Sequence, residues 1–350
     1  MIYNLSGPFI KTGKGKLSRE EWNGVLTVTL YIKEDCHLCA EVINVLGKLK
    51  EEFPHQLVVL DIEKEDLTQK FGEKVPVVEI GPYTIKTPFN KKTLRMTLGA
   101  AQDRADHLGN INDKAHRKRV ERGKNISTAD RFFYWFSNHY MLVFNFFVFL
   151  YVGLAFLAPI LMKSGLERPA GFIYTIYSRF CHQLSFRSWF LFGGQIAYPR
   201  ALANVSRLMT YAEATGFDPV NLERAHSFLG NAILGYKTAL CQRDVAIYGS
   251  ILLFGLVFSL AKKKFKSIPF WAWVVFGMVP IGLDGVSQLI SQLPFDIFPY
   301  RESTPFLRTL TGALFGFTTA WFGYPLVEET MEDTRSIMAK KIAAVKTRKQ

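Results

Sequence analysis

The hydrophobic and polar positions divide the chain into a polar first part and an apolar remainder. Residues 1–130 mix charged and apolar side chains as water-soluble domains do, whereas the later sequence holds four stretches that are nearly free of charge. A helix needs about 20 apolar residues to cross a bilayer. The stretches therefore predict about four transmembrane helices, at 141–162, 244–261, 269–290 and 306–327.

Short β-branched runs alternate with helical spacing in the soluble part. Val25 to Ile32 is apolar enough for a buried strand, and Leu38, Val42 and Leu46 then recur at helical spacing. Continued along the chain, this pattern predicts strands at 25–32, 57–62, 75–80 and 83–86, and helices at 38–49, 64–71 and 91–101. The order is βαβ, helix, ββ, helix, which predicts an α/β fold.

The same patterns divide the chain into five segments. They are a loosely ordered lead-in at 1–24, a soluble domain at 25–101, a basic linker at 102–139, an all-helical membrane domain at 140–327 and a basic tail at 328–350. Within the membrane domain, 170–192 is apolar but carries charges, which favours a helix at the membrane boundary, and 196–240 is expected to be a helical insertion. Because the first span begins near residue 140, we expect no secretory signal peptide.

The net charge of the chain helps to orient these spans. The 43 Lys and Arg against 30 Asp and Glu give a formal charge of +13, which in a soluble chain would suggest nucleic acid. Here the basic residues crowd beside the spans, at 114–124, 262–266 and 335–349, and cytoplasmic loops are enriched in such residues. We therefore expect membrane lipid rather than nucleic acid as a partner, and an inner (cytoplasmic) membrane protein with both termini in the cytoplasm.

Two of the four cysteines form a Cys-x-x-Cys pair at the start of a predicted helix. Unpaired N–H groups and the positive end of the helix dipole favour the thiolate form of Cys36 and lower its pKa. Three residues are about one helical turn, so Cys39 can attack a mixed disulfide formed on Cys36. This arrangement predicts thiol–disulfide exchange.

The segment 25–101 resembles the glutaredoxin-like members of the thioredoxin fold, in a compact bacterial subgroup. The resemblance rests on Asp-Cys-His-Leu-Cys after the first strand, on Val-Pro before the third strand and on the ββα end. It implies that Cys36 is the nucleophile, that Cys39 is the resolving thiol and that Pro76 is a cis-proline beside the site. It also implies that Lys33 meets a carboxylate of glutathione and that Val75 lies in the substrate-binding region.

Two alternatives remain open for this pair. The Gly-Gly pair by which glutaredoxins bind glutathione is replaced by Phe-Asn-Lys-Lys at 89–92, so glutathione stays an open cofactor and a cytosolic thiol or disulfide protein an open partner. The other alternative is half of a zinc site, but no second Cys-x-x-Cys or histidine pair lies nearby in the sequence to complete four ligands. Redox chemistry is the favoured interpretation.

Polar residues also gather where the predicted topology places the outer ends of the spans. Asp284, Ser287, Gln288 and Ser291 share one helix face, because they recur at i, i+3, i+4 and i+7. Ionisable residues at membrane depth are costly and are usually paired or functional. The other members of this expected cluster are Cys181, His182, Gln183, Arg187, Cys241, Arg243, Asp244, Arg301, Glu302 and Arg308.

The segment 140–327 resembles an uncharacterised family of predicted bacterial membrane proteins. The residues that carry the resemblance are Cys181-His182-Gln183, Arg187-Ser188, Cys241, Arg243, Tyr248, Asp284, Gly285, Gln288, Arg301-Glu302-Ser303, Arg308, Thr311 and Gly312. The resemblance implies a membrane domain of unknown function and supplies no activity.

Three interpretations of the polar cluster stay open. It can be a buried ion-pair network that holds the helices together. It can bind a metal ion through Cys181, His182 and Cys241 with Asp244 or Asp284, which are acceptable ligand types without a diagnostic spacing. It can also contain a Cys181–Cys241 disulfide, if this side of the membrane is oxidising.

The sequence thus supports three functional hypotheses. The first is a membrane-anchored thiol–disulfide oxidoreductase that uses Cys36 and Cys39. The second is a membrane protein that binds or transports a metal or small ion, with an accessory redox module. The third is a membrane scaffold whose polar cluster is structural.

Overall fold

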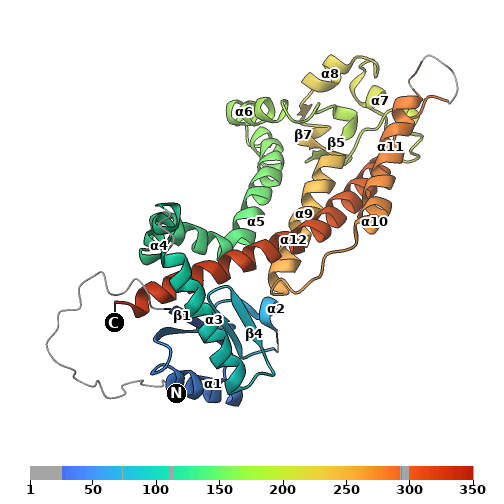
Figure 1. Ribbon diagram of the computed structural model, residues 1–350. Helices are drawn as coiled ribbons and strands as arrows, with labels where there is room; N and C mark the ends of the chain where they lie inside the picture. Colours follow the sequence, from blue (N-terminus) through green and yellow to red (C-terminus); the bar gives the residue numbers. More distant parts are fainter. Residues whose placement is uncertain (1–25, 73, 111–113, 292, 294–298, 350) are drawn as a thin grey trace. The chain divides into compact units, whose positions relative to one another are not determined.

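The computed structural model describes residues 26–72, 74–110, 114–291, 293 and 299–349 (Figure 1). The lead-in expected at 1–24 lies outside the described residues. The chain forms two compact units, of which the first comprises the N-terminal part to Trp135 together with Glu332–Gln350, and the second comprises Phe136–Met331. The first unit is therefore built from both ends of the chain.

The first unit is centred on a four-stranded mixed sheet of order β2-β1-β3-β4. Strand β1 pairs in parallel with β2 and antiparallel with β3, which pairs antiparallel with β4. The strands are β1 (Leu26–Ile32), β2 (His55–Asp61), β3 (Val77–Ile80) and β4 (Tyr83–Lys86). The helices before the membrane part are α1 (His37–Leu49), α2 (Thr68–Phe71), α3 (Lys91–Asn110) and α4 (Lys114–Lys124). The predicted α/β order is confirmed.

Helices α1 and α3 cover one face of this sheet. Their buried residues recur at the spacing expected of an amphipathic helix, as at Val42, Leu46 and Leu49 of α1. They join Val28 and Leu30 of β1 in one core cluster. Helix α3 runs on to Asn110 and α4 follows, so most of the expected linker at 102–139 is helical.

The C-terminal end of helix α12 (Pro305–Thr347) packs against a second apolar cluster of the first unit. Ala339, 4% exposed, lies in this cluster with Tyr31 of β1 and Phe71 of α2. The expectation of a basic tail at 328–350 did not include this packing. Ala339 and Ser336 are small and bury little apolar surface, so hydropathy alone does not reveal them.

Polar contacts hold this helix end in place. Burial raises the pKa of the Tyr31 hydroxyl above its usual value, and this hydroxyl donates to Glu79 Oε2 at 3.2 Å and lies 3.2 Å from Ser336 Oγ. Lys340 Nζ donates to the same carboxylate oxygen at 2.6 Å. Arg335, fully buried, donates to the main-chain oxygen of Asp66 at 3.1 Å. The contacts of Ser336, Lys340 and Arg335 join α12 to three different parts of the N-terminal segment.

The second unit is mostly helical. Its helices are most of α5 (Thr128–Lys163), α6 (Glu167–Tyr177), η2 (Ser185–Arg187), η3 (Ala201–Ala203), α7 (Tyr211–Thr215), α8 (Leu222–Ser227), α9 (Gln242–Leu260), α10 (Phe270–Trp273), η4 (Val274–Met278) and α11 (Val279–Ile290), with the first part of α12. Among the described residues, three helices are long and apolar enough to cross a membrane: Thr128–Lys163, Gln242–Leu260 and Phe270–Ile290. The fourth predicted span lies in α12, which is not one of the three; threonines, glycines and Arg308 lower its apolar content.

Helix α12 nevertheless packs closely on α9 within this unit. A Cβ on Gly312 would lie 2.7 Å from the Arg243 oxygen, and one on Gly316 would collide with the Ile247 oxygen. Small residues four positions apart let membrane helices approach at the backbone. Phe254 and Phe258 of α9 extend the contact through a core cluster that includes Ala320.

A small sheet, which the all-helical prediction missed, joins the end of the insertion to the segment before it. Strands β5 (Ser188–Leu191), β6 (Gly230–Asn231) and β7 (Gly235–Cys241) form an antiparallel sheet of order β5-β7-β6. Gly235 has φ 81° and its backbone approaches that of Leu191 too closely for a Cβ. The segment 170–192, expected as one boundary helix, is instead the short helix α6 followed by a turn, η2 and β5.

Candidate functional sites: a dithiol pair and a polar cluster

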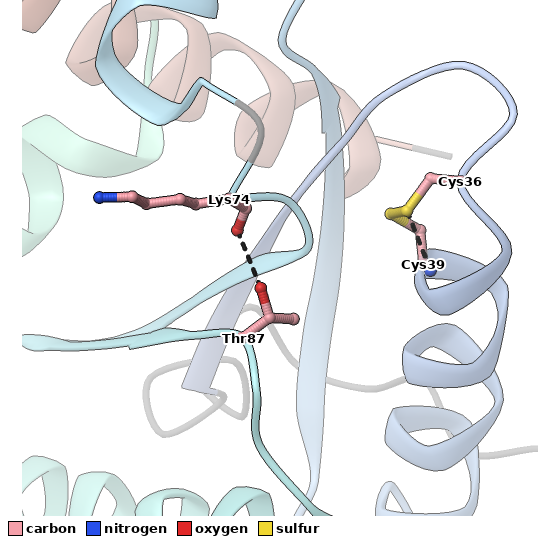
Figure 2. Close-up of a disulfide and its surroundings, with 4 residues drawn as sticks. All are labelled: Cys36, Cys39, Lys74 and Thr87. Atoms are coloured by element: carbon pink, nitrogen blue, oxygen red, sulfur yellow. Dashed lines mark hydrogen bonds between the residues drawn. A yellow bond between two sulfur atoms is a disulfide. The ribbon is translucent and has the colours of Figure 1, made fainter.

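The disulfide Cys36–Cys39 lies where β1 leads into α1 (Figure 2). Cys36 is the N-cap of α1, and the amide N–H of Cys39 donates to Cys36 Sγ at 3.2 Å. The positive φ of Asp35, 59°, belongs to the turn that brings Cys36 to the helix start. Cys36 is half-buried, whereas Cys39 is 3% exposed. An incoming thiol or disulfide therefore has better access to Cys36.

A second segment of interest is the loop before β3. Figure 2 shows Lys74 of this loop and Thr87; the Thr87 hydroxyl donates to the Lys74 main-chain oxygen at 3.2 Å. The peptide bond Val75–Pro76 that follows is cis, and Pro76 is buried while Val75 is half-buried. Lys33 is at the surface, with its Nζ 3.5 Å from Glu63 Oε1. The roles of these residues in substrate binding stay predictions.

The polar cluster of the second unit has two carboxylate centres. The first is Asp284 of α11, 4% exposed, which accepts hydrogen bonds from Arg243, from Arg301 Nη2 at 3.2 Å and from Ser303 Oγ at 2.8 Å. The main-chain oxygen of Asp284 also accepts from Gln288 Nε2 at 2.8 Å. Both oxygens of this carboxylate are therefore already engaged in ion pairs and hydrogen bonds.

The second centre is Glu302, 5% exposed, which three arginines surround. Its oxygens accept from Arg187 Nε at 2.9 Å, Arg200 Nη1 at 3.4 Å and Arg308 Nη2 at 2.6 Å. Arg308 Nη2 also donates to Gln288 Oε1 at 2.9 Å, so Gln288 joins the two centres. This geometry fits the ion-pair interpretation of these residues.

Cys181, Cys241 and Asp244 form a separate group. Their ligand atoms all lie within 4.8 Å of one another. Cys181 is buried and both cysteines are free thiols. The thiol of Cys181 donates to the sulfur of Cys241, which raises the pKa of Cys181 and lowers that of Cys241. Cys241 is therefore the more acidic thiol of the pair.

The remaining candidates fall outside this group. His182 is exposed and its main-chain oxygen accepts from His226 Nδ1 at 2.8 Å. Gln183 is buried, with its Nε2 donating to the Tyr174 oxygen at 2.9 Å. Of the metal candidates in the sequence, the structure brings together Cys181, Cys241 and Asp244, and it places Asp284 in the ion-pair cluster.

In the described part of the second unit, the sequence reasoning missed the burial of two cations. Arg200, 7% exposed, joins the Glu302 centre, and Lys237 is fully buried in β7. Lys237 Nζ donates to the main-chain oxygens of Gln183 at 2.7 Å and His226 at 2.5 Å, and burial lowers its pKa to about 7. The sequence signal for Lys237 is a lysine inside the largely apolar run Tyr-Lys-Thr-Ala-Leu. This signal indicates a buried lysine only if the run is recognised as a strand.

The fold and the disulfide define the class of the first unit as a thioredoxin-fold module attached to a helical membrane unit. Residues 27–99 match the family described as glutaredoxin-like domain (DUF836), and residues 223–322 match the family described as predicted membrane protein (DUF2085). The chain is thus a glutaredoxin-like domain joined to a predicted membrane protein domain of unknown function, as predicted. The second match includes Cys241, Asp284 and Glu302 but begins after Cys181.

One curated relative is similar to the chain over much of its length. It is the uncharacterized protein MJ1492 of Methanocaldococcus jannaschii, which is 26% identical over 202 residues, covering 55% of this chain and 95% of the relative. No solved structure matches the chain significantly.

Proposed function

We propose that this protein is a membrane-anchored thiol–disulfide oxidoreductase, with Cys36 as the attacking thiol and Cys39 as the resolving thiol. The observation that carries the proposal is the position of the disulfide: one sulfur at the half-exposed N-cap of α1, the other buried one turn later. The N-cap position favours the Cys36 thiolate, because the Cys39 amide and the helix dipole stabilise its charge.

The exchange runs in two balanced steps. The Cys36 thiolate attacks a partner disulfide, forming a mixed disulfide and releasing one partner sulfur as a thiolate that takes up a proton. Cys39 then attacks Cys36 Sγ, so the second partner sulfur leaves and the Cys36–Cys39 disulfide forms. The partner gains two electrons and two protons, and a thiol donor must return them to the protein. Glutathione or a protein dithiol is the class of donor.

The surface beside the disulfide supports a protein partner. Leu38, between the two cysteines, is 52% exposed, and an apolar side chain next to Cys36 offers a contact to a protein substrate. At the position of the glutaredoxin Gly-Gly pair, Asn90 instead accepts from the Thr93 amide at 2.9 Å at the start of α3. This departs from the glutathione-binding pattern of the family.

The first unit contains segments from both ends of the chain, which supports an even number of membrane crossings between them. Residues from both ends of the chain share one apolar cluster, which supports placing both ends on the same side of the membrane. Three helices qualify as spans by length and composition, and we assign the part of α12 that packs on α9 as the fourth. The basic stretches at 114–124, 262–266 and 335–349 favour the cytoplasm for that side. We therefore place the dithiol pair in the cytoplasm.

A trapping experiment tests the exchange. The variant Cys39→Ser retains the attacking thiol but lacks the resolving one, so we expect it to accumulate mixed disulfides with partners in intact cells. These species should disappear on reduction and should be absent from Cys36→Ser, the matched control. Equal trapping by both variants, or a full-length protein in micelles that reduces no model disulfide, would refute the proposal.

A further inference from the structure

We propose that Cys181, Cys241 and Asp244 form a binding site for a divalent metal ion of the zinc class. Their two sulfur atoms and a carboxylate oxygen lie within 4.8 Å of one another. Zinc takes thiolate sulfur at about 2.3 Å and carboxylate oxygen at about 2.0–2.2 Å. Ligands around a tetrahedral ion of that size stand about 3.3–3.8 Å apart, so a closure of roughly 1 Å by side-chain rotation is enough to form the site.

The three ligands come from elements that are held in place without any ion. Cys181 follows α6, and its amide donates to the Tyr177 oxygen at 2.9 Å. Cys241 ends β7 and is the N-cap of α9, and Asp244 lies in the first turn of the same helix. Ser188 of β5 pairs with Cys241 in the sheet, and this pairing fixes the backbone position of the second cysteine.

Buried hydrogen bonds tie the two cysteine-bearing segments to each other. Lys237, four residues before Cys241, donates to the oxygen of Gln183, two residues after Cys181, at 2.7 Å. The Tyr174 hydroxyl donates to the Lys237 oxygen at 2.5 Å, and Gln183 Nε2 donates to the Tyr174 oxygen. The site is thus preformed, which lowers the entropic cost of binding an ion.

The surroundings favour a cation among these groups. Cys181 and Cys241 pack with Ala239, Leu240 and Tyr177 in an apolar cluster. In such surroundings three potential anions repel one another and are poorly solvated. A divalent ion replaces this repulsion with three bonds and leaves its fourth position for water or another donor, the coordination found in catalytic zinc sites.

A disulfide is the competing occupant of the same cysteines. In the structure both are free thiols, and the carboxylate of Asp244 is the third member of the group. A disulfide gives that carboxylate no role, whereas a metal ion uses all three side chains. The metal site does not depend on the proposed function, because Cys36 and Cys39 take no part in it.

Cobalt titration of the full-length protein in detergent micelles tests the site. The protein carries Cys36→Ser and Cys39→Ser, so only the two remaining cysteines can bind Co²⁺ through sulfur, and a phosphine reductant keeps them reduced. We expect sulfur-to-cobalt charge-transfer absorption and the visible bands of tetrahedral Co²⁺, saturating at one equivalent and lost on addition of Zn²⁺. As-isolated wild-type protein should contain bound metal by elemental analysis.

Single variants identify the ligands. Cys181→Ser and Cys241→Ser should each abolish the charge-transfer bands, whereas Asp244→Asn should retain sulfur ligation with an affinity lower by at least about 10-fold. His182→Ala, the matched control, should bind as the parent does. Circular dichroism of each variant separates loss of ligand from loss of fold.

Three outcomes would overturn the inference. They are a folded parent without cobalt bands, bands that persist in Cys181→Ser, and a protein purified without reductant whose two thiols are quantitatively oxidised and which takes up no metal after reduction. The last outcome would assign the pair as a disulfide.

Discussion

A carboxylate introduced at Ala339 tests whether the end of α12 is part of the core of the first unit. Ala339 packs in the apolar cluster of Tyr31 and Phe71 and is 4% exposed. The variant Ala339→Asp must either bury an unpaired charge, which costs several kcal/mol, or detach the helix end from the sheet. Because detachment is always available, the loss of stability cannot exceed the free energy with which this helix segment binds to the sheet.

The expected loss of stability follows from the cost of burying the charge or of detaching the helix end. Detachment also breaks the Lys340–Glu79 contact and exposes the aromatic residues of the cluster. A loss of about 3 kcal/mol raises the population of open molecules by roughly two orders of magnitude, since about 1.4 kcal/mol corresponds to a factor of ten. Strands β1 and β2, whose residues Tyr31 and Val58 form this cluster, should show the increase.

Hydrogen exchange followed by mass spectrometry, on the full-length protein in micelles, measures this opening directly. Ile337→Asp is the matched control, because Ile337 lies on the same helix and is 54% exposed. We expect amide protection in β1 and β2 to fall by about 100-fold in Ala339→Asp and to change little in Ile337→Asp. Equal protection in the two variants would show that this helix end adds no stability to the first unit.

Three further predictions concern the charged residues and the topology. Glu302→Gln leaves Arg187, Arg200 and Arg308 without their shared carboxylate, so we expect about 3–5 kcal/mol of destabilisation in thermal unfolding, against almost none for the exposed Glu223→Gln; similar melting of both would contradict an ion-pair role. Burial lowers the pKa of His55 below its usual value, so the unfolded chain binds protons first as pH falls; amide protection of β2 should be constant above about pH 6.5, fall below it, and lose this pH dependence in His55→Gln. Ile233→Cys, 80% exposed in the insertion, should react with a membrane-impermeant thiol reagent in intact cells when Cys181 and Cys241 are replaced by serine, whereas Cys36 should react only after lysis; labelling of Cys36 alone in intact cells would reverse the topology.

Local patterns were sufficient to predict much of this protein. The Cys-x-x-Cys pair, the strands around it and the order of the first unit follow from short apolar runs and helical spacing, because each of these features is set by neighbours in the chain. Three apolar helices were found for the same reason, since a membrane span is a property of about 20 consecutive residues. Asp284 and Gln288 were correctly placed on one helix face by their spacing, and both are buried.

Long-range pairings were not predictable in this way. Ser188 pairs with Cys241 across an intervening insertion. β5 is only four residues long, and β7 lacks the alternation of a half-exposed strand because most of its residues are buried. Arg200 and Lys237 lie in segments without a distinctive pattern, so their burial depends on partners elsewhere in the chain.

The sequence by itself determined the class of the chain: a glutaredoxin-like dithiol domain joined to an apolar helical domain. These properties are carried by contiguous residues, and the physical terms behind them, apolar burial and helix capping, act over one or two turns. Only the tertiary structure decided that the C-terminal end of α12 completes the first unit. It also decided that Cys181 lies beside Cys241 and Asp244, whereas Asp284 forms ion pairs with arginines. Those outcomes depend on contacts between residues distant in sequence, such as Ala339 in the apolar cluster of Tyr31 and Phe71, and hydropathy along the chain does not reveal them.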